Sequence, residues 1–152
     1  MTDVYLGLGS NLGDRHTLLL AAIEQLVQRV GRLVRCSSFI ETEPWGFVSE
    51  HPFLNAVALF RTTLSPRELL VITQAIEHEL GRTGKTAGVP MSSGTVALPS
   101  YQDRSIDIDI LLYGDEHIDE PDLRIPHPHM QERDFVQRPL AELRSLLAAS
   151  RQ

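Results

Sequence analysis

The spacing of apolar and polar side chains along the chain predicts alternating strands and helices. Apolar residues that alternate with polar ones, or that form short continuous runs, predict strands at residues 4–8, 32–42, 53–62 and 104–112. Apolar residues at helical spacing predict helices over about residues 15–30, 66–80 and 139–149. After the turn at residues 113–116, a short return strand is expected at residues 117–118.

Capping residues mark where two of these helices begin and end. Asp14 can accept hydrogen bonds from the free backbone amides of the first helix, and Gly31 is expected to end it. Ser65 and Glu68 form the capping box that opens the second helix. Gly81 is the expected C-cap of that helix.

The order of the elements predicts the fold. Strand, helix, strand, strand, helix, strand is the order of a ferredoxin-like βαββαβ sandwich, a fold of the α+β class. Its helices would cover one face of an antiparallel sheet and leave the other face available for a site. A C-terminal hairpin and helix would complete a single domain over residues 1–152. Two stretches without periodicity, about 43–52 and 83–103, are expected to be mobile loops.

Two acids on the strand at 104–112 are the strongest chemical signal. Asp107 and Asp109 fall on one face of this strand, while isoleucines fall on the other, because successive side chains of a strand point to opposite faces. Two residues of rise separate the carboxylates by roughly 6–7 Å at the backbone. Like charges at this spacing repel each other, and a divalent cation would offset that repulsion. The alternative is an exposed strand face on which both carboxylates are solvated.

Composition and charge narrow the class of protein. The chain has 42% apolar and 22% charged residues, a formal charge of −6 and a pI of about 5.4, so no overall field attracts nucleic acid or an anionic membrane. It has no signal peptide pattern and no apolar run of membrane-spanning length, which predicts a cytoplasmic location. The single cysteine, Cys36, excludes an internal disulfide and is interpreted as core packing.

Three side chains outside the acidic strand have two interpretations each. Trp45, on the loop at 43–52, either covers an edge of the core or forms a pocket for a flat ligand. Asn55, an amide among apolar neighbours, either binds a turn or recognises the edge of a heterocycle. Glu77 is either a solvated helix acid or a group that faces the strand acids.

Three other features bear on possible anion and metal sites. The glycines between residues 7 and 13 match no phosphate-loop motif and are interpreted as a tight strand-to-helix connection. Positive charges mark the two ends of the loop at 83–103. His127 and His129 have no third nitrogen or sulfur ligand near them in sequence, so zinc is not expected.

Five segments, taken together, resemble the 6-hydroxymethyl-7,8-dihydropterin pyrophosphokinase family. They are YLGLGSNLGDR, ETEPWG followed by PFLNAV, EHELGR, RSIDIDIL and IPHPHMQERDFVQRPL, and they extend over nearly the whole chain in this order. The resemblance implies a ferredoxin-like core. It also implies transfer of pyrophosphate from ATP to the hydroxymethyl group of the pterin in folate biosynthesis, with magnesium as cofactor and AMP as product.

The resemblance also implies roles for individual residues. Asp107 and Asp109 would hold two magnesium ions and, with Arg82 and Arg104, form the catalytic group. The residues implied in pterin binding are Thr42, Glu43, Pro44, Trp45, Gly46, Phe53, Asn55 and Phe135. The residues implied in nucleotide binding are Glu77, Arg82, Lys85, Arg104, Ile106, His127 and Arg133.

The chain departs from the family pattern in the loop at 83–103. Many members have a basic run that contains tryptophan just before the arginine that precedes the acidic strand, where this chain has residues 99–103. Gly84 stands where an arginine is common, so nucleotide closure is expected to be weaker unless Lys85 and Tyr101 compensate. Two alternatives to this enzyme are considered, the first because of the altered loop and the second because of the ferredoxin-like fold. One is a non-catalytic relative that binds pterin or nucleotide, and the other is an RNA-binding module, which the acidic pI disfavours. The expected enzyme is a monomer that binds neither nucleic acid nor membrane.

Overall fold

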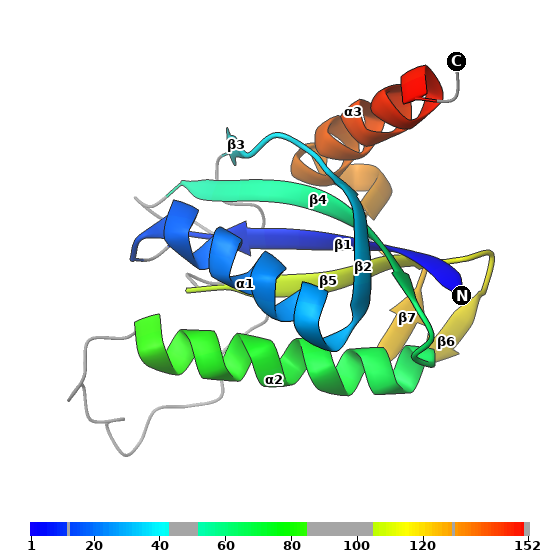
Figure 1. The fold of residues 1–152 in the computed structure, drawn as a ribbon, viewed down its shortest axis with the longest axis horizontal. Helices are drawn as coiled ribbons and strands as arrows, with labels where there is room; N and C mark the ends of the chain where they lie inside the picture. Colours follow the sequence, from blue (N-terminus) through cyan, green and yellow to red (C-terminus); the bar gives the residue numbers. More distant parts are fainter. Residues whose placement is uncertain (12, 43–51, 85–104, 129, 151–152) are drawn as a thin grey trace.

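The computed structural model of the chain describes residues 1–11, 13–42, 52–84, 105–128 and 130–150 (Figure 1). Its strands are β1 (Thr2–Ser10), β2 (Gly31–Cys36), β3 (Ile40–Thr42), β4 (Phe53–Thr62), β5 (Asp107–Tyr113), β6 (Ile118–Glu120) and β7 (Leu123–Ile125). Its helices are α1 (Arg15–Arg29), α2 (Pro66–Gly84), the 3₁₀ turn η1 (Met130–Glu132) and α3 (Asp134–Ser150). None of the helices within these ranges is long and apolar enough to cross a membrane.

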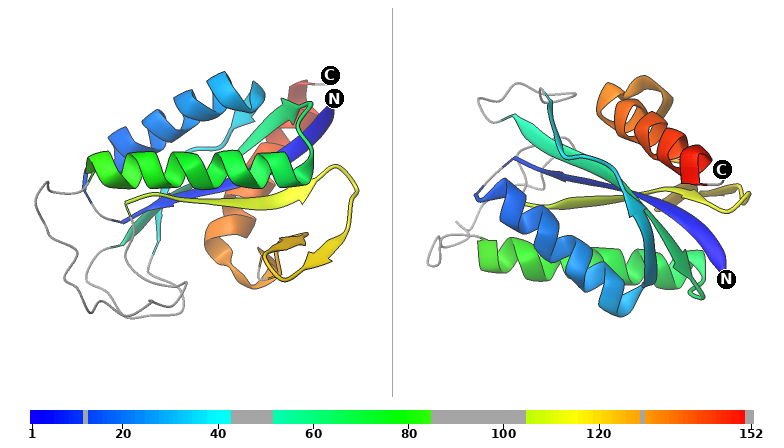
Figure 2. Two further views of the ribbon diagram at one scale, coloured as in Figure 1. Left: turned by 90° about the horizontal axis from the view of Figure 1, so that it is seen from below. Right: turned by 45° about the horizontal axis from the view of Figure 1, so that its top comes forward.

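The main sheet has the strand order of the predicted ferredoxin-like sandwich. Its order is β2-β4-β1-β5, with β3 also paired to β4, and every pairing is antiparallel. Figure 2 shows α1 and α2 together on one face of this sheet and α3 on the other. The two helices of the βαββαβ core therefore cover one face, as predicted, and the C-terminal helix, whose place was not predicted, lies on the face expected to be free. Part of the second face is covered by α3, and only the remainder is available for a site.

Two apolar cores correspond to the two faces of the sheet. The larger core joins α1 and α2 to the sheet through buried residues that include Leu6, Leu19, Phe60, Ile76 and Ile108. The smaller core joins α3 to the opposite face through Val57, Leu59, Leu111, Met130, Val136, Leu140 and Leu143. The sheet thus separates two hydrophobic layers, and its uncovered part begins where the α3 layer ends.

The strand predicted at residues 32–42 is interrupted. Cys36 pairs with Ala58, and Ile40 pairs with Asn55. Three residues therefore lie between these pairs on the first chain segment, but only two lie opposite them on β4. The hydroxyl of Ser37 accepts a hydrogen bond from the Val57 amide at 2.9 Å, and the Ser37 amide donates to the Val57 carbonyl at 2.9 Å. These side-chain and backbone bonds replace the ladder that the extra residue breaks.

Other elements also differ from those predicted. Gly81 lies inside α2, because a glycine costs a helix only about 1 kcal/mol and does not have to end it. Helix α3 begins at Asp134 instead of Pro139, since the Arg133 carbonyl already accepts hydrogen bonds from the amides at 136 and 137. The return strand β6 pairs with β7 as a separate two-stranded sheet.

Cys36 packs against the larger core, as expected for a structural thiol. Burial, and next the nearby charge of Glu142, raise the pKa of its thiol to about 11. The thiol is therefore protonated at neutral pH and is a weak nucleophile.

The N-terminal caps predicted for the first two helices are confirmed. Asp14 accepts a hydrogen bond from the Thr17 amide at 3.2 Å, and this bond is the main cause that lowers the pKa of the Asp14 carboxyl. At the start of α2 the Ser65 amide donates to the Glu68 carboxylate at 2.8 Å, and the Glu68 amide donates to the Ser65 hydroxyl at 3.2 Å.

Replacing Ser65 with alanine is expected to lower the free energy of unfolding by about 1 kcal/mol, because an amide at the start of α2 loses its partner. Urea unfolding followed by circular dichroism would measure the change. Ser65→Thr retains the hydroxyl and serves as the control. Equal stability of Ser65→Ala and the wild type would show that the capping box contributes nothing.

Candidate active site

The uncovered part of the second sheet face is formed by three neighbouring strands. On β1 this face carries glycine at positions 7 and 9, so no side chain rises from the central strand. Gly9 pairs with Asn55 of β4 on one side and with Asp107 of β5 on the other, and Gly7 pairs with Asp109. Asn55 and Asp107 thus flank a bare strip of backbone and stand two strand spacings apart, roughly 10 Å. Such a strip gives a flat ligand a surface between an amide and two carboxylates.

The two aspartates project from β5 as the period-two pattern predicted. The flanking isoleucines, Ile106, Ile108 and Ile110, are buried in the larger core, which fixes the opposite face of the strand. Asp107 and Asp109 are half-buried, so both carboxylates are accessible to a ligand while water remains nearby.

Asp109 lies beside two basic side chains that come from a distant part of the sequence. Nη1 of Arg133 is 3.5 Å from its Oδ2, and Nε2 of His127 is 3.9 Å from its Oδ1. The His127 amide donates to the Leu111 carbonyl at 3.0 Å, which holds the segment after β7 against β5. Arg133 is only 4% exposed, so its cation is fixed at the site instead of ranging through solvent. The arrangement gathers positive charge next to the carboxylates, where a polyphosphate needs it.

Glu77 reaches β5 from the opposite face of the sheet. Its Oε2 accepts a hydrogen bond at 2.7 Å from the amide of Ile108, the residue between the two aspartates. Strand β5 is an edge of the main sheet, and its outward backbone groups need partners from outside the ladder. Of the two interpretations of Glu77, the structure therefore favours the group that faces the acidic strand over a solvated helix acid.

Asn55 is held on the other side of the glycine strip. Its side chain is buried, and its Nδ2 donates to the hydroxyl of Thr42 on β3. A Cβ placed on Gly9 would lie 2.7 Å from Asn55 Oδ1 and 3.4 Å from a ring carbon of Phe53. The amide carbonyl and this ring therefore both lie over Gly9, and the carbonyl can accept a hydrogen bond from the edge of a ligand there.

The other candidate residues are placed only in part. Arg82 lies in the last turn of α2 and Phe135 in the first turn of α3, and the structure describes their backbone alone. Six candidates lie outside the described residues: Glu43, Pro44, Trp45, Gly46, Lys85 and Arg104. His129 also lies outside them, as do the loops predicted to be mobile, except for residue 52 of the first and residues 83 and 84 of the second.

The described acids suit a hard divalent cation that shares its ligands with phosphate. Within the described ranges, no group of three or more histidine, cysteine, aspartate or glutamate side chains could hold a metal by itself. Magnesium takes one or two carboxylates and completes its shell with phosphate oxygens and water. Asp107 and Asp109, which pair with the glycines of β1 and project to the same face of the sheet, fit that requirement.

The importance of Gly7 and Gly9 was missed in the sequence. They lie within β1, whereas only Gly13, with φ of 74°, belongs to the turn that precedes α1. The sequence did contain a signal: two glycines two residues apart in an apolar strand. Glycines at this spacing leave one face of the strand without side chains. Glycines on a strand commonly mark a close approach by a ligand or by another backbone.

Fold and site together define the class: a ferredoxin-like α+β protein whose described residues place an amide and two carboxylates on the outer face of its sheet. A model of the 7,8-dihydro-6-hydroxymethylpterin-pyrophosphokinase (HPPK) family matches residues 5–145. The chain therefore belongs to the HPPK family, and it is a pyrophosphokinase of folate biosynthesis. This membership agrees with the enzyme that the sequence suggested and disagrees with the RNA-binding alternative.

Similar proteins cover most of the chain. The 2-amino-4-hydroxy-6-hydroxymethyldihydropteridine pyrophosphokinase of Porphyromonas gingivalis strain W83 is 57% identical over 144 residues, which cover 94% of this chain and 91% of that protein. The protein of the same name from Bacillus subtilis strain 168 is 43% identical over 140 residues, which cover 91% of this chain and 76% of that protein.

Solved structures show the same fold at low identity. An HPPK-DHPS in complex with substrates matches with a TM-score of 0.67 and 13% identity, over 93% of this chain and 40% of that chain. The wild-type Plasmodium falciparum HPPK-DHPS with pteroate matches with a TM-score of 0.65 and 17% identity, over 93% of this chain and 38% of that chain. This chain thus spans about two fifths of those longer chains.

Proposed function

We propose that this protein transfers pyrophosphate from ATP to the hydroxymethyl group of 6-hydroxymethyl-7,8-dihydropterin, giving AMP and the pterin diphosphate. Enzymes of this family use ATP as the co-substrate. The observation that carries the proposal is the row Asn55–Gly9–Asp107, which places an amide, a bare strip of backbone and a carboxylate side by side. A flat ring bound over Gly9 by the amide would direct a substituent toward the aspartates.

Pterin recognition is assigned to one end of this row. The carbonyl of Asn55 accepts a hydrogen bond from the edge of the ring, and the ring of Phe53 stacks on it, with Phe135 proposed on its other side. The hydroxyl of Thr42 holds the Asn55 amide in place by accepting a hydrogen bond from Nδ2. The residues proposed to complete this end are Glu43, Pro44, Trp45 and Gly46.

Nucleotide and metal binding are assigned to the other end. Asp107 and Asp109 would hold two magnesium ions, which when bound neutralise phosphate charge and lower the pKa of a coordinated hydroxyl. Arg133 and His127 beside Asp109 would contact the triphosphate. The further residues proposed for the nucleotide are Glu77, Arg82, Lys85, Arg104 and Ile106, of which Arg82 and Arg104 also stabilise the transferring group.

The chemistry asks for positioning more than for a strong base. In phosphoryl-type transfer, most of the rate comes from alignment of the groups and from neutralisation of developing charge. The buried guanidinium of Arg133 supplies a fixed positive charge at Asp109. A carboxylate at the site, such as Asp109, can accept the proton that the pterin hydroxyl loses.

We also propose that the protein acts as a single domain over residues 1–152, as a monomer, in the cytoplasm and without nucleic acid or membrane partners. The acidic pI supports the proposal that it binds no nucleic acid. The described helices, none of which could cross a membrane, support the proposal that it has no membrane partner. The loops at about 43–52 and 83–103 are proposed to move during the catalytic cycle.

The proposed activity is tested by incubating the protein with ATP, magnesium and the reduced hydroxymethylpterin and separating the nucleotides. AMP is expected in amounts equal to the pterin diphosphate formed, and none is expected without the pterin. ADP alone, or unchanged ATP with folded protein that binds both substrates, would contradict the activity. The second of these outcomes would favour a non-catalytic relative.

A further inference from the structure

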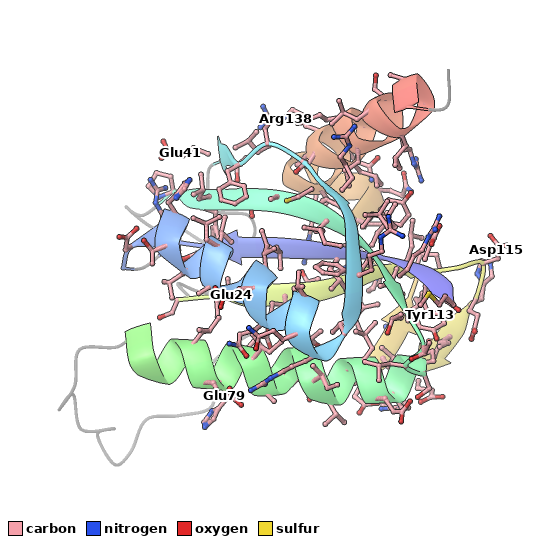
Figure 3. All side chains as sticks on the ribbon, viewed as in Figure 1. Glu24, Glu41, Glu79, Tyr113, Asp115 and Arg138 are labelled. Carbon is pink, nitrogen blue, oxygen red and sulfur yellow. The ribbon has the colours of Figure 1, made fainter. Side chains whose placement is uncertain are left out.

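Arg15, the first residue of α1, joins the ends of two strands that carry the proposed pterin residues. Its Nη2 donates to Oε2 of Glu41 on β3 at 2.8 Å, and its Nη1 donates to the carbonyl of Pro52, just before β4, at 3.0 Å. Figure 3 labels Glu41 on β3, next to the first turn of α1. One guanidinium thus bridges the last part of β3 and the residue that leads into β4.

Strand β3 needs such a support because its own ladder is short. It consists of three residues, and the pairing described for it is with β4, through Ile40 with Asn55 and Thr42 with Phe53. The extra residue between β2 and β3 uncouples β3 from the longer strand before it. At that joint, Oε2 of Glu142 on α3 accepts hydrogen bonds from the amide and the hydroxyl of Ser38, at 2.9 and 2.8 Å. Arg15 holds the opposite end.

Strand β3 supplies a hydrogen-bond partner of the Asn55 amide. The hydroxyl of Thr42 accepts from Nδ2 of Asn55, so Oδ1 of the amide turns toward the glycine strip. If β3 shifts or frays at its end, this hydroxyl moves with it and the amide can rotate. A rotated amide would present a donor where the ligand needs an acceptor.

We propose that Arg15 is a positioning residue for pterin recognition: by tying Glu41 to the Pro52 carbonyl it holds Thr42 where the Thr42 hydroxyl keeps the Asn55 carbonyl over Gly9. This inference rests on the proposed function, because it gives Asn55 a role in binding the ring. Arg15 acts through Thr42 and makes no contact with the ligand. It therefore sets the affinity for pterin and leaves the nucleotide end of the site unchanged.

The chain offers a closely matched control. Arg29, at the other end of α1, makes a two-pronged contact with Glu79 of α2 at 3.3 and 2.8 Å. The side chains of Arg15 and Glu41 are 30% and 57% exposed, and those of Arg29 and Glu79 are 35% and 51% exposed. Both pairs are surface contacts of the kind that adds little to stability. The two differ in that only the Arg15 pair reaches the strands of the site.

The test compares Arg15→Gln and Arg29→Gln with the wild type, by fluorescence titration of the pterin and by steady-state kinetics. Arg15→Gln is expected to raise Kd and KM for the pterin about tenfold, with KM for ATP unchanged. Arg29→Gln is expected to change neither. Equal pterin affinity of Arg15→Gln and the wild type would overturn the inference, as would an equal loss in Arg29→Gln or an equal loss of ATP affinity.

Two further measurements keep the result interpretable. Glu41→Gln removes one of the two contacts while retaining the bond to the Pro52 carbonyl, so a smaller loss of pterin affinity than in Arg15→Gln is expected; no loss at all in either variant would overturn the inference. A wild-type protein that fails to bind the pterin would instead contradict the proposed function. Thermal melting of each variant identifies any change that comes from unfolding.

Discussion

Replacing Asp107 with alanine is expected to reduce turnover by about a thousandfold without unfolding the protein. The carboxylate is one of two that would bind magnesium, and metal-assisted charge neutralisation contributes several kcal/mol to the transition state, where 1.36 kcal/mol corresponds to a factor of ten. The fold should tolerate the change because Asp107 is half-buried and its backbone pairing with Gly9 remains. Removing one of two neighbouring like charges also relieves repulsion in the metal-free protein. AMP formation and thermal melting, each with and without magnesium, measure both effects.

Asp119→Ala is the control for the loss of one acid. Asp119 lies on β6 and forms a surface ion pair with Arg124 at 3.3 Å. The side chain of Asp119 is 91% exposed and that of Arg124 is 57% exposed. Its replacement should leave turnover unchanged. Near-normal rates in Asp107→Ala would show that Asp107 is not a metal ligand. Loss of folding in Asp107→Ala at temperatures where Asp119→Ala is folded would contradict the expectation that the fold tolerates the change.

The acidic strand could be predicted because its pattern is local. The alternation of isoleucine with aspartate between residues 106 and 110 is a period-two signal, and in the structure the isoleucines are buried and both aspartates point to the other face. The caps at Asp14 and Ser65 were predicted for the same reason, since a cap is a matter of residues three positions apart.

The features that sequence reasoning missed depend on residues far apart. The break between β2 and β3 exists because Ser37 can satisfy the backbone of Val57, twenty residues later. The placement of Arg133 beside Asp109 requires that the segment after β7 fold back against β5, twenty-four residues earlier. The cover that α3 gives to the second sheet face follows from an apolar stripe that could have packed on either side. No local periodicity selects among such long-range pairings.

The same distinction explains how the site works. The local pattern of β5 supplies the acids, but the groups that surround them come from elsewhere: Glu77 from α2, His127 from the segment after β7 and Arg133 from the start of α3. In the sheet, Gly9 of β1 pairs with Asn55 on one side and with Asp107 on the other. This register brings the amide end and the acidic end of the site into one row. The ferredoxin-like order, with β1 between β4 and β5, is therefore a requirement of the site as well as of the core.

Replacing Gly9 with alanine is expected to weaken pterin binding by about 10- to 100-fold. The new Cβ would lie 2.7 Å from Oδ1 of Asn55, closer than such atoms approach, so the amide must leave its place over the strand. Losing a well-placed hydrogen bond costs about 1–3 kcal/mol, which corresponds to that range of affinity. Binding of ATP should change far less, because the substitution faces the amide end of the row. Fluorescence titration with the pterin and with a non-hydrolysable ATP analogue would measure both affinities.

Gly7→Ala separates this clash from a general effect of side chains on β1. Gly7 lies on the same face, but a Cβ there would meet only the side chain of Leu111, at 3.4–3.6 Å, which is ordinary packing distance. Pterin affinity in Gly7→Ala should stay within about twofold of the wild type, because no polar group has to move. If Gly9→Ala bound the pterin as tightly as Gly7→Ala does, Asn55 could not be the group that holds the ring. The ligand would then have to lie elsewhere than on the bare strip of β1, since the alanine methyl would occupy the surface on which the ring is proposed to rest.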